Sequence, residues 1–288
     1  MKRKILTIVA GAAGLVAAYF LVSGISHTIY QRPEQNTPTE SSEAQTAEVA
    51  TEEAKAAMTE DEINEMLADM KSTETAQTEA VSEETAAIPV KFEELWQVNP
   101  DVYAWITVPG TEIDYPILQH PSDNSYYLMH NIDGSYGYPG CVYTENLNSK
   151  DFTDNNTVIY GHNMKNGSMF AQLHKFEDPD FFNENREVLI YLPDEVLHYT
   201  IFAAHIYDDR HLLYSFDFSD PEVYEKYLQS VFDTRDMSAN IDRDMTVTKE
   251  DQIITLVTCI GSQPNNRLLV QAVLTEREPG AETADTAE

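Results

Sequence analysis

The sequence predicts a mainly β domain with short helices, whose strands form a closed or nearly closed barrel. Many short apolar runs are separated by turn residues such as Pro109-Gly110 and Asp123-Asn124. Only a few segments place apolar residues at helical spacing, and strands and helices do not alternate regularly. A parallel, doubly wound sheet requires that alternation, so this pattern favours a barrel. A transmembrane helix and a disordered spacer are expected to precede the domain.

The N-terminal sequence predicts a membrane anchor. Residues 1–4 are basic, and residues 5–25 contain no charged side chain. About 20 apolar residues span a bilayer as a helix. A cleavable signal peptide is the alternative, but its apolar region is typically about 7–15 residues. Because basic flanks stay in the cytoplasm, we expect a single-pass cell-membrane protein with a cytoplasmic N-terminus and an extracellular domain.

Residues 31–89 predict a flexible acidic spacer. They are rich in Glu, Thr, Ala and Ser and poor in aromatic and branched aliphatic residues. Such a segment cannot bury enough apolar surface to offset its ordering entropy. One part differs, because Thr59 and Glu62 have capping-box spacing and the apolar residues after them recur at helical spacing. A short, marginal helix is expected there.

The folded domain is expected over residues 90–275, followed by a disordered tail at 276–288. Period-2 apolar runs between turn signals indicate the strands. We expect strands at 102–108, 113–118, 140–143, 157–160, 187–192, 197–207, 245–247, 253–259 and 267–270, and helices at 92–96, 168–175 and 220–232.

Composition excludes some functions. The formal net charge is −31, so nucleic acid is a poor candidate partner, because phosphate binding needs basic patches. Solubility is the simplest account of this charge. The two cysteines, Cys141 and Cys259, are too few for a disulfide framework.

A thiol and a guanidinium are expected at one rim of the sheet. Cys259 ends one strand, a short polar loop follows, and Arg267 opens the next strand. A free cysteine is often only a small buried hydrophobic residue. Its position at the strand end and a permanent positive charge nearby favour a reactive thiolate instead. The residues alone leave both interpretations open.

His162 is the candidate partner of this cysteine. A histidine at a strand end is usually a surface residue, yet imidazole is the usual proton-transfer partner of a cysteine nucleophile. The sequence places His205 and His211 close together, but no third ligand accompanies them. Zinc sites need three or four ligands, so no metal site is expected.

Several motifs resemble the sortases, the transpeptidases of Gram-positive cell surfaces. TLVTC at 255–259, with Arg267 eight residues after the cysteine, is similar to the sortase cysteine signature. IYGHNMKNGSMFAQL at 159–173 resembles the histidine segment of class B members. WITVPGTEIDYPILQ at 105–119, DNSYYL at 123–128 and the helix expected at 220–232 resemble the same class. The resemblance covers residues 91–275.

The resemblance implies an eight-stranded sortase barrel and a mechanism. Cys259 would attack the threonine carbonyl of a C-terminal sorting signal and form a thioester. His162 would protonate the leaving amine and then deprotonate the incoming one, and Arg267 would bind substrate and stabilise the oxyanion. Substrate contacts are implied at three further residues, namely Asn124, Leu128 and Thr258.

The implied partners are surface proteins that carry a sorting signal and an acceptor amine. The amine would belong to a peptidoglycan precursor or cross-bridge, or to a pilin lysine, and no cofactor is implied. Some class B members carry an acidic residue directly after the cysteine. This chain has Ile260-Gly261 there, so an assisting carboxylate would come from elsewhere. Cys141 is expected to be a buried thiol, since a disulfide with Cys259 would abolish the activity.

Two other functions remain open from the residues. An exported cysteine peptidase or amidase would transfer the acyl group to water, but papain-like enzymes carry the cysteine before the histidine. Here His162 precedes Cys259. A barrel that only binds a ligand would not need His162, Cys259 and Arg267 together.

Overall fold

The computed structural model describes residues 58–71 and 87–280. The predicted anchor at 5–25, most of the predicted spacer and residues 281–288 lie outside the described residues. Among residues 58–71 and 87–280, none of the helices combines the length and the apolar character that a membrane span requires.

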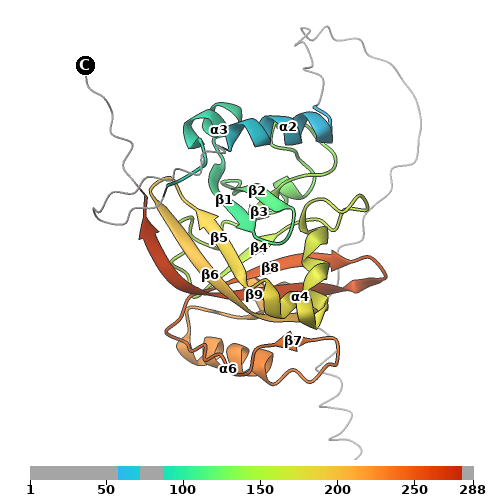
Figure 1. The fold of residues 1–288 in the computed structure, drawn as a ribbon, viewed down its shortest axis with the longest axis vertical. Helices are drawn as coiled ribbons and strands as arrows, with labels where there is room; N and C mark the ends of the chain where they lie inside the picture. The colour runs from blue at the N-terminus through green and yellow to red at the C-terminus, as the bar shows by residue number, and fades with distance from the viewer. Residues whose placement is uncertain (1–57, 72–86, 281–288) are drawn as a thin grey trace, which may run out of the picture. The chain divides into compact units, whose positions relative to one another are not determined.

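Eight strands form a closed ring (Figure 1). They follow the order β5-β1-β2-β3-β4-β8-β9-β6, and a pairing between β5 and β6 closes the barrel. The prediction of a closed eight-stranded barrel is therefore confirmed. The strands are β1 (Val102–Val108), β2 (Ile113–Leu118), β3 (Val142–Thr144), β4 (Asn156–Tyr160), β5 (Glu187–Tyr191), β6 (Glu195–Asp208), β8 (Ile253–Ile260) and β9 (Gln263–Pro279); the short β7 (Asn240–Ile241) pairs with β6 outside the ring.

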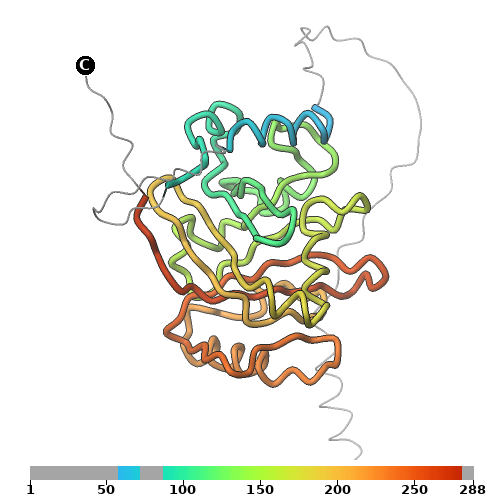
Figure 2. Tube along the Cα trace, in the orientation of Figure 1, coloured from blue at the N-terminus to red at the C-terminus, as the bar shows by residue number. Residues whose placement is uncertain are grey.

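Strand β8 is buried on both faces along most of its length. Ile254 and Leu256 belong to the cluster that fills the barrel. Ile253 and Val257 belong to a second cluster, on the outer face, together with apolar residues of α6 (Pro221–Phe232). Figure 2 shows α6 lying across the outside of the barrel. Alternate residues of a strand point to opposite faces, so Cys259 follows Val257 on the outer side, and there it is exposed.

Some elements differ from the prediction. The strand expected at 245–247 is wrong, because aspartate side chains bind this segment's backbone instead. Asp242 accepts a hydrogen bond from the N–H of Met245, and Asp251 accepts one from Thr248. The helix expected at 168–175 is a 3₁₀ helix, η2 (Phe170–Glu177). Three short helices were not predicted, namely η1 (Tyr126–Leu128), α4 (Pro179–Glu184) and α5 (Leu212–Ser215).

The C-terminal strand is longer than expected. Strand β9 continues to Pro279 because residues 276–279 pair with the start of β6. Arg277 also forms an ion pair with Glu195, with 2.7 Å between Nη1 and Oε1. Strand β9 therefore runs a few residues past residue 275, since cross-strand partners hold this polar segment.

The helix expected inside the spacer is present but belongs to the domain. Helix α2 (Glu60–Met70) has the capping box formed by Thr59 and Glu62. Its buried residues Ile63 and Leu67 join the cluster that contains residues of α3 (Phe92–Val98). In Figure 1, α2 and α3 lie on the same side of the barrel. Helix α2 is thus a packed part of the domain rather than a marginal helix in a free spacer.

Polar contacts also attach α2 to the barrel. Lys71 forms an ion pair with Asp114 of β2, and the same carboxylate oxygen accepts a hydrogen bond from Trp105 Nε1 at 2.8 Å. At the other end of the helix, Glu60 Oε1 accepts a hydrogen bond from Ser168 Oγ at 2.7 Å. The second contact matters for the site, because Ser168 lies on the segment that follows His162.

Replacing Leu67 with alanine should destabilise the domain by about 2 kcal/mol, near the lower end of the range for buried leucines. The expected cause is the cavity left between α2 and the barrel. Urea unfolding of the purified protein measures the effect, and Glu65→Ala on the exposed face of α2 is the control. Equal stability of the two variants would show that α2 does not pack on the barrel in solution.

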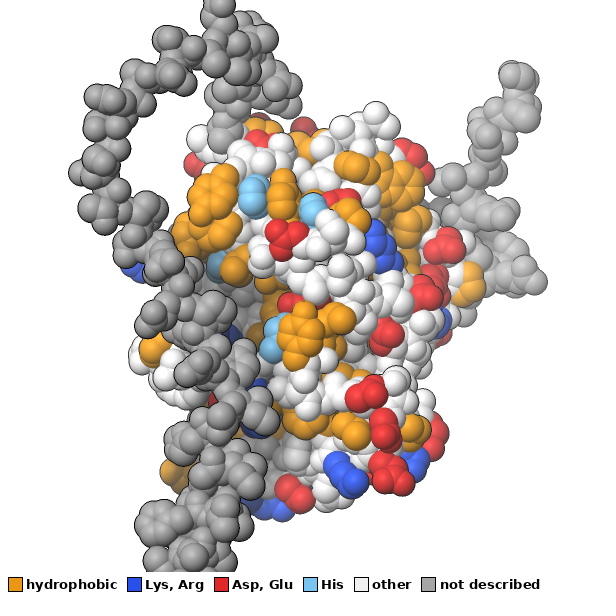
Figure 3. Space-filling view, turned by 180° about the vertical axis from the view of Figure 1, so that it is seen from behind, with side chains coloured by type: hydrophobic (Ala, Val, Ile, Leu, Met, Phe, Trp, Pro, Cys, Tyr) orange, Lys and Arg blue, Asp and Glu red, His pale blue; other side chains and the backbone are white. Residues whose placement is uncertain are grey.

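Acidic side chains do not gather in one place on the face shown in Figure 3. They lie singly or in small groups among apolar and uncharged side chains. This distribution fits a role of the negative charge in solubility.

Candidate active site

Cys259 and Arg267 lie opposite each other on paired strands. The β8–β9 register pairs them directly and is interrupted immediately afterwards, between Cys259 and Ile260. Arg267 Nη1 donates hydrogen bonds to the carbonyl oxygens of Pro264 and Asn266, at 3.0 and 2.9 Å. One nitrogen of the guanidinium therefore holds the first residues of β9 in place.

His162 lies just beyond the end of β4. Its Nε2 is 2.7 Å from the carbonyl oxygen of Leu128, and its ring packs edge-on against Tyr138 with 5.1 Å between centroids. A carbonyl oxygen only accepts hydrogen bonds, so Nε2 carries a proton in this arrangement. The imidazole is thus held with an N–H available for donation.

Hydrogen bonds tie the His162 segment to the end of β8. Parallel pairing of β4 with β8 ends at Tyr160 and Val257. The Gly161 N–H then donates to the Val257 carbonyl at 3.1 Å, and Thr258 Oγ1 donates to the Gly161 carbonyl at 2.9 Å. These bonds fix the residues beside His162 to those beside Cys259, which explains how two distant motifs meet.

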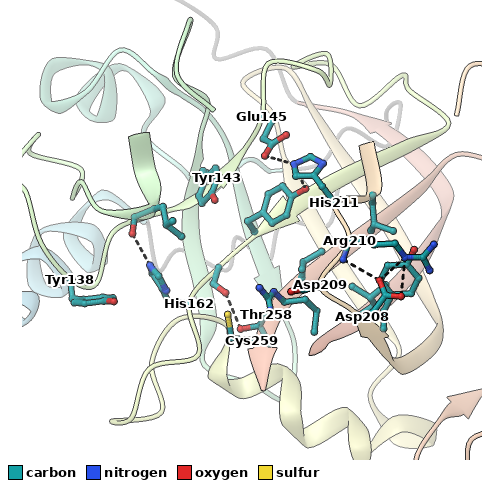
Figure 4. A pocket seen from close by; sticks show the side chains of 18 residues that line it. Tyr138, Tyr143, Glu145, His162, Asp208, Asp209, Arg210, His211, Thr258 and Cys259 are labelled. Carbon is teal, nitrogen blue, oxygen red and sulfur yellow. Dashed lines mark hydrogen bonds and ion pairs between the residues drawn. The ribbon is translucent and has the colours of Figure 1, made fainter. Parts of the chain in front are cut away.

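The three predicted catalytic residues line one pocket. Its volume is about 470 Å³, and His162, Cys259 and Arg267 all contribute to its wall. In Figure 4, His162 and the sulfur of Cys259 lie near one another, with Glu145 and His211 at another part of the wall. The barrel therefore brings together the thiol, the imidazole and the guanidinium that the sequence singles out.

The three predicted substrate-binding residues fall in different places. Leu128 lines the pocket with 41% of its surface exposed, and its carbonyl holds His162. Thr258 also lines the pocket but is only 2% exposed, with its hydroxyl bound to Gly161. Asn124 does not line this pocket, and its Oδ1 accepts a hydrogen bond from the Asn146 N–H at 2.9 Å.

A buried acid–histidine pair in the pocket wall was missed by the sequence analysis. Glu145 follows β3 and is 7% exposed, and its Oε1 accepts a hydrogen bond from His211 Nε2 at 2.7 Å. Among the described residues, Glu145 Oε2 and His211 Nδ1 have no hydrogen-bond partner. The pair joins the end of β3 to the loop before α5. No spacing rule connects these residues, so only the fold reveals them.

Two stacked tyrosines form the neighbouring part of the wall. The rings of Tyr143 and Tyr160 have centroids 5.4 Å apart, and the Tyr160 hydroxyl is 3.5 Å from His211 Nε2. Burial raises the pKa of both phenols. They remain neutral hydrogen-bonding groups at physiological pH.

Carboxylates in this pocket come from outside the cysteine motif. Glu145, Asp208 and Asp209 line it. The hydrogen bond from Arg210 Nε to Asp208 Oδ1, at 2.8 Å, lowers the pKa of the Asp208 carboxyl. Asp208 is thus stabilised as an anion, whereas Glu145 is hydrogen-bonded to His211.

Cys141 is a buried free thiol, as predicted. Both cysteines are free, and Cys141 Sγ donates to the His130 carbonyl at 3.4 Å. Burial raises the pKa of the Cys141 thiol, which keeps it protonated and unreactive. Cys259 is therefore the exposed thiol of the domain.

The histidines considered as metal ligands do not converge. His205 is buried and its Nε2 lies 3.2 Å from Gln271 Oε1, whereas His211 pairs with Glu145. Burial lowers the pKa of His205, so it stays neutral. Within residues 58–71 and 87–280, no group of three or more His, Cys, Asp or Glu side chains could hold a metal ion.

Comparisons with known proteins agree with this geometry. Residues 106–275 match the family model of the sortase domain. The chain is 37% identical to sortase B of Listeria monocytogenes over 171 residues, which are 59% of this chain and 67% of that protein.

Solved structures of sortase B share the fold. The Clostridium perfringens structure has a TM-score of 0.56 and 34% identity, covering 64% of this chain and 100% of that chain. A Staphylococcus aureus sortase B–substrate complex has a TM-score of 0.57 and 25% identity, covering 65% and 85%.

Proposed function

The chain belongs to the sortase family, whose members are cysteine transpeptidases, and we propose that it is a membrane-anchored, class B-like enzyme that attaches surface proteins to the cell wall. It cleaves a C-terminal sorting signal after threonine and transfers the new C-terminus to a peptidoglycan amine. The observation that carries the proposal is the shared pocket of His162, Cys259 and Arg267.

The first half-reaction forms a thioester. The Cys259 thiolate attacks the threonine carbonyl carbon, and the resulting oxyanion lies beside the Arg267 guanidinium. When the C–N bond breaks, His162 gives its Nε2 proton to the leaving amine. In this step His162 has to leave the Leu128 carbonyl, to which it donates at 2.7 Å.

The second half-reaction transfers the acyl group. The acceptor amine attacks the thioester carbonyl, His162 takes the amine proton, and the C–S bond breaks to restore the Cys259 thiolate. A pilin lysine supplies the same nucleophile, so pilus assembly is the alternative outcome. An exported peptidase would use water in place of the amine.

The decisive experiment compares amine with water as acceptor. The purified full-length protein in detergent is incubated with a library of sorting-signal peptides and an amine, and the products are followed by mass spectrometry. Amide exchange is expected. Cleavage by water alone, unchanged by added amine, would favour the peptidase. Exchange onto a pilin lysine but not onto a cross-bridge amine would favour pilus assembly.

The anchor is tested separately. An epitope inserted after Tyr30 should be accessible from outside intact cells, because residues 5–25 are proposed to span the membrane with Lys2, Arg3 and Lys4 inside. A protected epitope would reverse the orientation, and release of the protein into the medium would indicate a cleaved signal peptide.

Arg267→Lys should lower kcat/KM by roughly 10²- to 10³-fold, the usual loss for an oxyanion-stabilising donor. Arg267 Nη1 already binds the carbonyls of Pro264 and Asn266, and a single ammonium cannot both hold these and reach a substrate oxygen. Steady-state kinetics measure the loss. The matched control is Arg243→Lys, since Arg243 also binds backbone carbonyls, those of Phe232 and Thr234. Equal activity of the two variants would remove Arg267 from the mechanism.

A further inference from the structure

The carbonyl oxygen of Cys259 is bound by side chains where the β4–β8 ladder has ended. Carbonyls of alternate residues point to the same edge of a strand, so those of Val257 and Cys259 both face β4. The Gly161 N–H binds the Val257 carbonyl. The next carbonyl, of Cys259, instead accepts a hydrogen bond from Asn163 Nδ2 at 2.8 Å, and His174 Nε2 lies 3.2 Å from the same oxygen.

The Asn163 amide is itself held in one orientation. Its Nδ2 is 2.9 Å from His174 Nε2, and His174 Nδ1 is 2.8 Å from Glu177 Oε2. A carboxylate only accepts, so His174 carries its proton on Nδ1 and leaves Nε2 as an acceptor. Asn163 therefore faces two acceptors, the Cys259 carbonyl and His174 Nε2. In the flipped orientation, the Asn163 Oδ1 atom would face these two acceptors and be repelled. In the observed orientation, the two amide hydrogens on Nδ2 can be donated to the two acceptors.

We propose that Asn163, His174 and Glu177 are positioning residues for the nucleophile. The inference rests on the proposed role of Cys259. By fixing the Cys259 carbonyl, this chain of hydrogen bonds fixes the peptide plane that carries the thiol. Asn163 also follows His162 directly, so the same contact sets the distance between the segments that carry the imidazole and the thiol.

The surroundings explain why such a support is needed. The register of β8 and β9 shifts between Cys259 and Ile260, so the ladder is irregular directly after the cysteine. Cys259 is exposed, whereas its neighbours Thr258 and Ile260 are buried. A misplacement of about 1 Å at a reacting group can cost about 10²-fold in rate.

Asn163→Ala should reduce kcat by roughly 10- to 100-fold, the range expected for a slightly misplaced nucleophile, with KM nearly unchanged. Asn163→Asp should be no better, because a carboxylate would face two acceptors. Lys165→Ala, an exposed change in the same loop, should keep full activity. The proposal would be overturned if Asn163→Ala raised KM as well as lowering kcat, or if it kept full activity.

His174 should act mainly by orienting Asn163, and its Nε2 also lies beside the Cys259 carbonyl oxygen, 3.2 Å away. His174→Ala is expected to lower kcat less than Asn163→Ala does. His174→Gln should recover most of that activity, because the glutamine carbonyl accepts from Asn163. The double variant should lose less activity than the product of the two single losses, since both changes act on the same Cys259 carbonyl. Independent, multiplying losses would refute the relay, with Lys175→Ala on the same 3₁₀ helix as control.

One further measurement separates this inference from the proposed function. If Cys259→Ala stays active, the proposed function fails. If Cys259→Ala is inactive while Asn163→Ala and His174→Ala keep the full kcat, only the positioning role fails.

Discussion

Replacing Cys259 with alanine should abolish thioester formation and amide exchange, with a loss of about 10⁴-fold or more, as for other enzymes that lose their nucleophile. Without the thiol, no covalent intermediate can divide the transfer into two half-reactions. Intact-protein mass spectrometry after mixing with a sorting-signal peptide shows the intermediate directly. The acyl adduct should form on the natural protein and be missing from the variant.

The chain provides its own control for this experiment. Cys141 is the other cysteine, and it is buried beside the His130 carbonyl. Cys141→Ala should keep both the acyl adduct and amide exchange, apart from a small loss of stability. An adduct that persists in Cys259→Ala but disappears in Cys141→Ala would show that Cys141, and not Cys259, is the nucleophile.

Local patterns account for the parts of the fold that were predicted well. Strand β1 matches its expected bounds, because Asn99-Pro100 and Pro109-Gly110 mark its two sides. Helix α6 begins as expected, since Asp220 caps it and Pro221 takes its first position. In both cases the signal lies within a few residues of the element, so the sequence suffices.

The remaining features depend on contacts between distant residues. The capping box predicted α2, but its packing depends on Lys71 meeting Asp114 on β2. The extension of β9 depends on β6, and the Glu145–His211 pair depends on the loop before α5. None of these partners is marked by a spacing in the sequence. The resemblance to a family identified His162, Cys259 and Arg267 as catalytic residues. Physical patterns alone did not decide whether Cys259 is a buried thiol or a nucleophile.

His162→Ala should slow transfer from an amide substrate by roughly 10²- to 10⁴-fold, the usual contribution of general acid–base catalysis. An amine is a poor leaving group unless it is protonated as the C–N bond breaks. The Nε2 proton that His162 now donates to the Leu128 carbonyl, at 2.7 Å, is the one available for that purpose. Single-turnover acylation of Cys259 measures the effect, with His198→Ala on β6 as control.

A second substrate shows which proton His162 moves. In a thioester analogue of the sorting signal the leaving thiolate needs no proton, so His162→Ala should acylate with this analogue far faster than with the amide. If His162 instead served to deprotonate Cys259, both substrates would slow by the same factor, and raising the pH would restore both. The hydrogen bond to Leu128 favours the first outcome, because it holds the imidazole as a proton donor directed away from the thiol. Substrate binding along Leu128 would then have to free this N–H, so the ring should reach the leaving amine only after the sorting signal has entered the pocket.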